Sequence, residues 1–178
     1  MSNNVVKVEN IMTKKVIVLH AEDNIEKATQ LFEEYDYDGF PVVNENGRLL
    51  GIVTAYDMVN HSYNTHLTPM ISILEDISRQ KEDEKKLAEQ FHNAKAVKIK
   101  DMMNIDPLVI SPEVRVEDLA KEFTEHHRVN PIPVIDPDKN LVGIVSRLDI
   151  IKFFDEKYLD SILQGSIHEG VLKRLDRL

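Results

Sequence analysis

Apolar and polar positions follow one another along this chain in an order that occurs twice. A short run rich in β-branched residues comes first, over residues 16–19 and again over 108–110, and predicts a strand in each copy. A stretch with apolar residues at helical spacing follows. Two further apolar runs, separated by turn-forming residues, come next, and each copy closes on the start of another helix. The repeated unit is therefore strand, helix, hairpin, helix.

The two copies align almost residue for residue. Met103 lies 91 residues after Met12 in the opening segment, and Gly143 lies 92 residues after Gly51 in the last apolar run. A single inserted residue reconciles the two offsets. Self-similarity of this kind predicts two copies of one structural unit.

The first helix of each copy has one apolar face. Asp23, with Glu26 three residues later, resembles a capping pair at the start of the first of these helices. The apolar positions are Ile25, Ala28, Leu31, Phe32 and Tyr35 in the first copy and Val116, Leu119, Ala120 and Phe123 in the second.

A hairpin follows in each copy. The turn of the first, residues 44–47, contains Asn and Gly, which tolerate the positive φ of a hairpin turn. The predicted strand pairs are 40–43 with 49–53 and 132–135 with 141–145.

A unit of about 50 to 60 residues can hardly cover one face of a sheet alone, so the two copies should pack together. The predicted fold class is α+β: two βαββα-type repeats, packed sheet to sheet with approximate two-fold symmetry and a cleft between them. The predicted domains are a first repeat at 1–62, a helical linker at 63–96, a second repeat at 97–156 and a helical tail at 157–178.

The linker and the tail each carry an apolar stripe. The linker is predicted to be a solvated helix, with a partner-contacting or dimer-contacting helix as the alternative. In the tail, Gly165 is predicted to break a helix that begins near Ile150, and a second helix starts at Ser166. We expect that tail to pack on the chain's own core, and the alternative is that it contacts a symmetric partner.

The most informative segments are Gly51–Asp57 and Gly143–Asp149. Each reads as a strand followed by Ser/Thr-x-x-Asp at the start of a helix. One interpretation is an N-terminal cap, with the hydroxyl accepting a backbone N–H. The other is a ligand site, in which the helix start attracts phosphate and the carboxylate accepts two ribose hydroxyls.

These segments, with the opening Met-Thr or Met-Asn and the Phe/Ile-Pro-Val start of each hairpin, resemble the cystathionine-β-synthase (CBS) domains, whose paired form is called a Bateman module. The resemblance covers roughly residues 7–62 and 97–156. It implies binding of AMP, ADP, ATP or S-adenosylmethionine between the repeats, with Mg²⁺ as an optional companion of ATP. Each site would combine both copies.

Carried over residue by residue, the resemblance implies two sites. The first would be formed by Thr54, Asp57, Pro107, Leu108, Val129, Asn130 and Pro131. The second would be formed by Thr13, Val16, Ile17, Tyr37, Asp38, Gly39, Ser146 and Asp149, with Arg147 as an additional candidate for charge compensation.

The two predicted sites differ in charge. Asp38 would repel a triphosphate, so the Asp149 site is expected to favour adenosine-like or cationic sulfonium ligands. The Asp57 site has Asn130 at the equivalent position and basic residues at 126–128, and is expected to tolerate phosphate better.

Composition narrows the function further. A net charge of −9 and a pI near 5.2 argue against nucleic acid as the main partner. The absence of cysteine excludes disulfides and thiolate chemistry. No signal-peptide or membrane-spanning pattern is visible, so a cytoplasmic protein without membrane insertion is expected. The seven histidines lack metal-ligand spacing, and no catalytic constellation or Gly-rich phosphate loop appears.

The sequence therefore predicts a non-catalytic regulatory module that binds an adenosine-type ligand. It is expected to form a homodimer and to act on a separate effector protein or through its own oligomer. The alternative is a purely structural dimerisation module, in which the Ser/Thr-x-x-Asp segments only cap helices.

Overall fold

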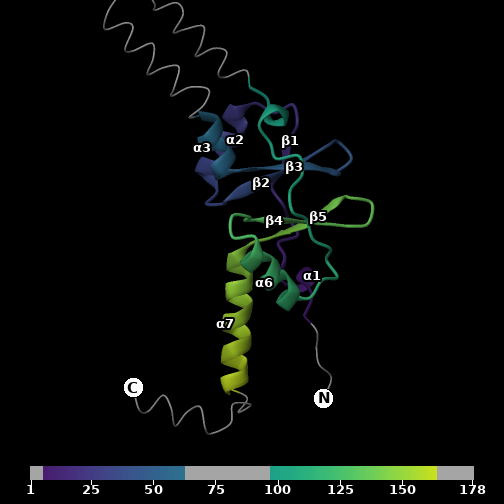
Figure 1. Cartoon of the computed structure of the whole chain (residues 1–178), viewed down its shortest axis with the longest axis vertical. Coiled ribbons are helices and arrows are strands. Elements are labelled where there is room, and N and C mark those ends of the chain that lie inside the picture. The colour runs from purple at the N-terminus through teal and green to yellow at the C-terminus, as the bar shows by residue number, and fades with distance from the viewer. Residues whose placement is uncertain (1–5, 63–96, 164–178) are drawn as a thin grey trace, which may run out of the picture.

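The computed structural model describes residues 6–62 and 97–163, in which two small sheets lie one above the other (Figure 1). The first sheet has the order β1 (Leu19–His20), β2 (Gly39–Val43), β3 (Leu49–Thr54), with β1 parallel to β2 and β2 antiparallel to β3. The second sheet pairs β4 (Ile132–Ile135) with β5 (Leu141–Val145) in antiparallel fashion. The α+β class predicted from the sequence is confirmed.

Helices flank both sheets. In the first copy they are α1 (Val8–Ile11), α2 (Ile25–Glu34) and α3 (Ala55–Ser62). In the second copy they are η2 (Ile99–Asp101, a 3-10 turn), α6 (Val116–Glu125) and α7 (Arg147–Leu163). α7 is continuous across the expected boundary between residues 156 and 157. The linker at 63–96 and the expected break at Gly165 lie outside the described residues.

The opening strands are shorter than the sequence predicts. In the first copy only Leu19 and His20 pair with β2, and Val16 and Ile17, which precede this short strand, line a cavity. In the second copy the strand predicted over 108–110 is reduced to a single parallel bridge between Ile110 and Val134. Prolines at 107 and 112 flank this segment and remove N–H donors that a longer ladder would need.

The cap of α2 also differs from the prediction. Asn24, not Asp23, occupies the N-cap position, and its side chain accepts a hydrogen bond from the backbone N–H of Lys27. Asp23 instead accepts from the backbone N–H of His20 and so closes the preceding turn. Asp and Asn side chains can both cap a helix or close a turn, so the sequence alone does not decide which of the two adjacent residues takes which role.

The two hairpins form as predicted, and their turns are organised in the same way. In the first turn Oδ1 of Asn44 accepts from the backbone N–H groups of Asn46 and Arg48, at 3.0 Å each. In the second turn the equivalent residue, Asp136, accepts from Asp138 and Asn140 at 2.9 and 2.8 Å. The hydrogen bond from the side-chain amide of Asn140, together with those from the two backbone N–H groups, lowers the pKa of the Asp136 carboxyl.

The opening segment of each copy crosses to the other copy. Val8 of α1 is fully buried in the second core, with Ile110, Leu119 and residues of the second sheet. Ile99 of η2 is fully buried in the first core, with Leu19 and residues of the first sheet. Neither core is therefore complete without a residue from the other repeat.

Backbone pairing follows the same exchange. Thr13, which follows α1, bridges to Ile144 of β5, and Asn104, which follows η2, bridges to Ile52 of β3. The crossing segments thus extend the opposite sheets by one bridge each. We call residues 6–13 and 97–104 the exchanged segments.

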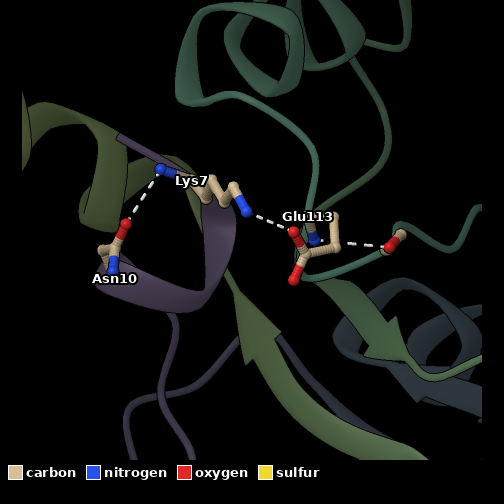
Figure 2. Close-up of polar contacts among 4 residues, drawn as sticks. Lys7, Asn10 and Glu113 are labelled. Carbon is tan, nitrogen blue, oxygen red and sulfur yellow. Dashed lines mark hydrogen bonds and ion pairs between the residues drawn. The ribbon is translucent and has the colours of Figure 1, made fainter. Parts of the chain in front are cut away.

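Two ion pairs fasten the exchanged segments at the surface, and their glutamates, Glu113 and Glu22, occupy equivalent positions in the two copies. Figure 2 shows Nζ of Lys7 donating to the carboxylate of Glu113 in the second copy. The other ion pair joins Lys100 to Glu22 in the first copy at 2.6 Å, while Lys98, the residue equivalent to Lys7, donates to the backbone carbonyl of Glu22 at 2.8 Å. The side-chain hydrogen bond from each lysine to its glutamate raises the lysine pKa in both pairs. Because the partners are exposed, these pairs add little stability and mainly fix position.

The hairpin turns themselves are joined. The backbone N–H of Leu49 donates to the carbonyl of Lys139, and that of Leu141 donates to the carbonyl of Gly47, both at 3.0 Å. Both turns therefore lie on the same side of the molecule (Figure 1), and the opposite ends of the strands face the helices α3 and α7.

Candidate functional site

The two Ser/Thr-x-x-Asp segments form reciprocal caps. Oδ2 of Asp149 accepts from both the backbone N–H and the hydroxyl of Ser146, at 2.7 Å each. Oδ2 of Asp57 does the same with Thr54, at 2.9 and 2.6 Å. In both copies the backbone N–H of the aspartate donates back to the hydroxyl, at 3.4 and 3.3 Å. The capping interpretation of these segments is thus confirmed, and it leaves a second carboxylate oxygen on each aspartate.

The Ser146–Asp149 cap opens into a cavity of about 310 Å³ between the repeats. Its volume is at the lower end of the ~300–1,000 Å³ typical of small-molecule sites. The first repeat contributes Thr13, Lys15, Val16, Ile17, Asp36, Tyr37, Asp38, Gly39 and Phe40. The second repeat contributes Asn130, Pro131, Ile144, Val145, Ser146, Leu148, Asp149 and Lys152.

This cavity brings together the residues predicted around Asp149. Thr13, Val16, Ile17, Tyr37, Asp38 and Gly39 all line it, with Ser146 and Asp149 on the opposite repeat. Gly39 allows the repeats to approach closely, since a Cβ at this position would lie 3.1 Å from Cδ of Pro131 in the second repeat.

Arg147 lies elsewhere. Its guanidinium donates to the carbonyls of His126 and His127, at 3.3 and 2.6 Å, and stands 5.2 Å from the centre of the Phe123 ring. Arg147 is not among the residues that line the cavity. The cationic side chains in the cavity wall are those of Lys15 and Lys152.

The residues predicted around Asp57 are distributed differently. Asn130 and Pro131 line the Asp149 cavity, and Leu108 and Val129 pack against the second core. Pro107 is half-buried beside Leu108. A second ligand site at Asp57 therefore stays a prediction from the sequence.

A chain of hydrogen bonds crosses the seam at the cavity wall. The side-chain amide of Asn130 donates to the carboxylate of Asp38, and its carbonyl oxygen accepts from the backbone N–H of Arg147 at 3.0 Å. The backbone carbonyl of Asp38 accepts from Ala55, the first residue of α3, at 3.0 Å. Asp38 and Asn130 occupy equivalent positions in the two copies, so this chain links the starts of α3 and α7.

Some lining residues were not expected from the sequence, notably Lys15, Asp36 and Lys152. Lys152 follows Asp149 by three residues on α7, and residues at that spacing share a helix face. That spacing could have identified Lys152. Lys15 and Asp36 lie next to predicted residues in loops, where no periodicity indicates which side chain faces the cavity.

Within residues 6–62 and 97–163, no group of three or more His, Asp or Glu side chains is placed to hold a metal ion. Within the same ranges, none of the helices has the length and apolar character needed to cross a membrane.

Comparison with known families agrees with this architecture. The model of the CBS domain matches residues 8–64 and 99–156. The chain belongs to the CBS domain family. The two matches coincide with the two repeats, so the protein contains a tandem CBS pair.

Several relatives share this pair. The uncharacterized protein MJ1426 of Methanocaldococcus jannaschii is 29% identical over 151 residues, which cover 82% of this chain and 89% of the relative. An inosine-5′-monophosphate dehydrogenase of the same organism is 27% identical over 146 residues, but these make up only 23% of that enzyme. CBS pairs of this kind therefore occur both as most of a chain and as a small part of a longer one.

Solved structures show the same fold. CBSX2, solved in complex with AMP, superposes with a TM-score of 0.65 at 22% identity, covering 85% of this chain and 98% of that one. The CBS pair of protein MJ0100, solved with 5′-methylthioadenosine and S-adenosyl-L-methionine, gives a TM-score of 0.60 at 22% identity, covering 86% and 98%.

Proposed function

We propose that this CBS pair is a non-catalytic regulatory module that binds an adenosine-containing ligand in the cavity beside Asp149. The observation that carries the proposal is the position of the Ser146–Asp149 cap, which belongs to the second repeat but opens into a cavity walled by both. A ligand held there touches both repeats at once, as a regulatory ligand must if it is to change their relative orientation.

The cap prepares Asp149 to hold a ribose. Its Oδ2 is occupied by Ser146, while Oδ1 has no hydrogen-bond partner within the described residues. A half-buried carboxylate oxygen of this kind is a strong acceptor for a ribose hydroxyl. The fixed cap also holds the carboxylate in one orientation, so little side-chain entropy is lost when a ligand binds.

Apolar and aromatic groups are available for the base. Val16, Ile17 and Val145 line the cavity, and Tyr37 adds an aromatic ring. The Tyr37 ring stacks on Tyr35 with 5.5 Å between centroids and 21° between planes, which restrains its orientation. Apolar walls with a few placed polar groups are typical of small-molecule sites.

The ligands of two structural neighbours support this ligand class. CBSX2 was solved with AMP, and the MJ0100 pair with 5′-methylthioadenosine and S-adenosyl-L-methionine. All three molecules contain adenosine, so the proposal concerns that common part. Binding of ATP, with or without Mg²⁺, belongs to the same proposal and is tested in the same experiment.

Thermal unfolding with adenosine, AMP, ATP, 5′-methylthioadenosine and S-adenosylmethionine tests the proposal. A compound that binds only the folded protein adds about 2.7 kcal/mol to the free energy of unfolding at 100 times its Kd, and Tm rises accordingly. ATP is used with and without Mg²⁺. If none of these compounds at millimolar concentration raises Tm, the module does not bind this ligand class.

A matched pair of variants locates the site. Asp149→Asn and Asp57→Asn each weaken a cap of the same geometry, so both should lose about 1 kcal/mol of stability. Only Asp149→Asn is expected to weaken ligand binding strongly, with a Kd about tenfold or more higher than that of the wild type when measured by calorimetry. Loss of binding in Asp57→Asn with retention in Asp149→Asn would transfer the site to the other repeat.

Dimerisation is a second candidate function, and the surface of the final helices favours it. Tyr56 and Val59 of α3 are 74% and 69% exposed, and Leu148 and Ile151 of α7, at the equivalent positions, are 55% and 62% exposed. Apolar side chains on the same face of two symmetry-related helices are suited to contact a second copy. We propose that this face forms a homodimer through which the module acts, either alone or on a separate effector protein.

Sedimentation equilibrium tests the dimer. The wild-type chain is expected to be dimeric at micromolar concentration, and Val59→Glu combined with Ile151→Glu to be monomeric, since a buried unpaired carboxylate is costly. Lys121→Glu, on the exposed face of α6, controls for the added negative charge. A wild-type monomer at all concentrations would remove the dimer and leave the ligand proposal untouched.

A further inference from the structure

The charges around the Asp149 cavity are unevenly balanced. Three carboxylates, those of Asp36, Asp38 and Asp149, line it together with two ammonium groups, those of Lys15 and Lys152. The wall therefore carries one excess negative charge. A ligand phosphate would enter a site where its own charge is opposed by more carboxylates than it is matched by cations.

The start of α7 offers few free donors to a phosphate. The backbone N–H of Ser146 donates to Asp149, that of Arg147 donates to Asn130, and that of Asp149 donates to the Ser146 hydroxyl. A helix start binds anions mainly through such N–H groups. Here a phosphate would have to displace hydrogen bonds that the protein already makes.

The arginine at this helix start is also engaged elsewhere. The Arg147 guanidinium donates to two backbone carbonyls of the loop after α6 and lies over the ring of Phe123. Meanwhile Asp38 is held at the cavity wall by the amide of Asn130. The cavity wall therefore contains the carboxylate of Asp38, whereas the guanidinium of Arg147 points to other partners.

From these observations we infer that the cavity selects adenosine derivatives whose 5′ substituent is uncharged or cationic, such as a thioether or a sulfonium, over 5′-phosphates. Asp38 is the specificity-determining residue. Its carboxylate repels a phosphate and attracts a sulfonium, while a thioether is affected little. The inference rests on the proposed adenosine site and adds the chemistry of its ligand.

Titration calorimetry at low salt tests the inference with four probes: 5′-methylthioadenosine, S-adenosylmethionine, AMP and ATP. For the wild type, the two sulfur compounds are expected to bind at least about fivefold more tightly than AMP, and ATP most weakly. Added salt should narrow the differences, because the cavity charges are largely exposed and therefore screened.

Asp38→Asn removes the charge and keeps an oxygen that can accept from Asn130. We expect it to tighten AMP binding by about three- to fivefold, to weaken S-adenosylmethionine by a similar factor and to leave 5′-methylthioadenosine nearly unchanged. Asp36→Asn should act in the same direction if Asp38→Asn folds poorly. Asp106→Asn, an exposed carboxylate outside the cavity, is the control for net charge and should change none of the four affinities.

The outcomes separate this inference from the proposed function. If AMP or ATP binds the wild type as tightly as the sulfur compounds, the selectivity is absent although the adenosine site stands. If Asp38→Asn changes all four affinities equally, Asp38 has a structural role and the assignment fails. If none of the four probes binds, the proposed function and the inference fall together.

Discussion

At the scale of single residues, the two copies provide their own controls. Gly51 and Gly143 occupy equivalent positions beside an exchanged segment, and both are buried. A Cβ at Gly51 would lie 2.4 Å from the backbone oxygen of Asn104, whereas one at Gly143 would lie 2.5 Å from the Met12 sulfur. The first neighbour is fixed by its pairing with β3, while the second is a flexible side chain.

Gly51→Ala should therefore destabilise the protein more than Gly143→Ala. Overpacking typically costs about 1–3 kcal/mol, and we expect the upper part of this range at Gly51 and the lower part at Gly143. Urea unfolding of both variants measures the difference. Equal losses would show that the backbone at Asn104 adapts as easily as the Met12 side chain.

Asp136 gives a prediction for pH. Its pKa is lowered in the folded state by the hydrogen bonds of the second hairpin turn, so its contribution to stability is present above the unfolded value near 3.8 and is lost as pH falls through the lower folded value. Asn44 fills the same role in the first turn without a charge.

Asp136→Asn should consequently flatten the acid limb of the stability curve below about pH 4 and change stability little at pH 7. Denaturant unfolding at a series of pH values measures both. An unchanged acid limb in this variant would assign the pH dependence to other carboxylates.

The residue scale also marks the limit of the sequence as a guide to the site. Ser146 and Asp149 were recognisable because a strand, a hydroxyl and an acid occur in a fixed order in both copies. Lys15 and Asp36 were not, since their side-chain directions depend on loop backbones with no periodicity. Arg147 was expected near the cavity because it neighbours Ser146, but its guanidinium donates to backbone carbonyls in the loop after α6.

At the scale of elements, the hairpins and main helices followed from local pattern. The strands β4 and β5 have the predicted bounds, and α6 buries the predicted face through Val116, Leu119 and Phe123. The exchange of the opening segments could not be predicted from local pattern. The apolar residues of α1 and η2 indicate that these segments are buried, but not which of the two cores buries them.

Ile99 and Ile105 test the exchange from within one segment of the chain. Ile99 is fully buried in the first core, and Ile105 is 73% exposed. Ile99→Ala should cost about 2–5 kcal/mol of unfolding free energy, because it leaves a cavity in a core built mainly by the other repeat. Ile105→Ala should cost less than about 0.5 kcal/mol. Chemical unfolding of both variants measures the contrast, and similar losses would argue against the burial of Ile99.

At the scale of the whole molecule, the exchange makes each repeat dependent on the other. Residues 1–62 alone would lack Ile99 in their core, and residues 97–178 alone would lack Val8. Neither fragment is expected to show a cooperative thermal transition by circular dichroism, whereas an equimolar mixture should recover one. A cooperative transition in either fragment alone would show that its core closes without the exchanged segment.

The backbone bonds between the two hairpin turns have a mechanical consequence. They tie the sheets together at one end of the strands, while the cavity lies at the other end, where Gly39 begins β2 and Val145 ends β5. A five-residue strand is roughly 17 Å long, so a rotation of only about 3° around the tied turns moves the far end by about 1 Å. If a ligand displaced the strand ends at the cavity, where the Asn130–Asp38 hydrogen bond also crosses the seam, the joined turns would be the centre of the rotation. Because α7 starts at that end, it would carry the displacement outward along its length.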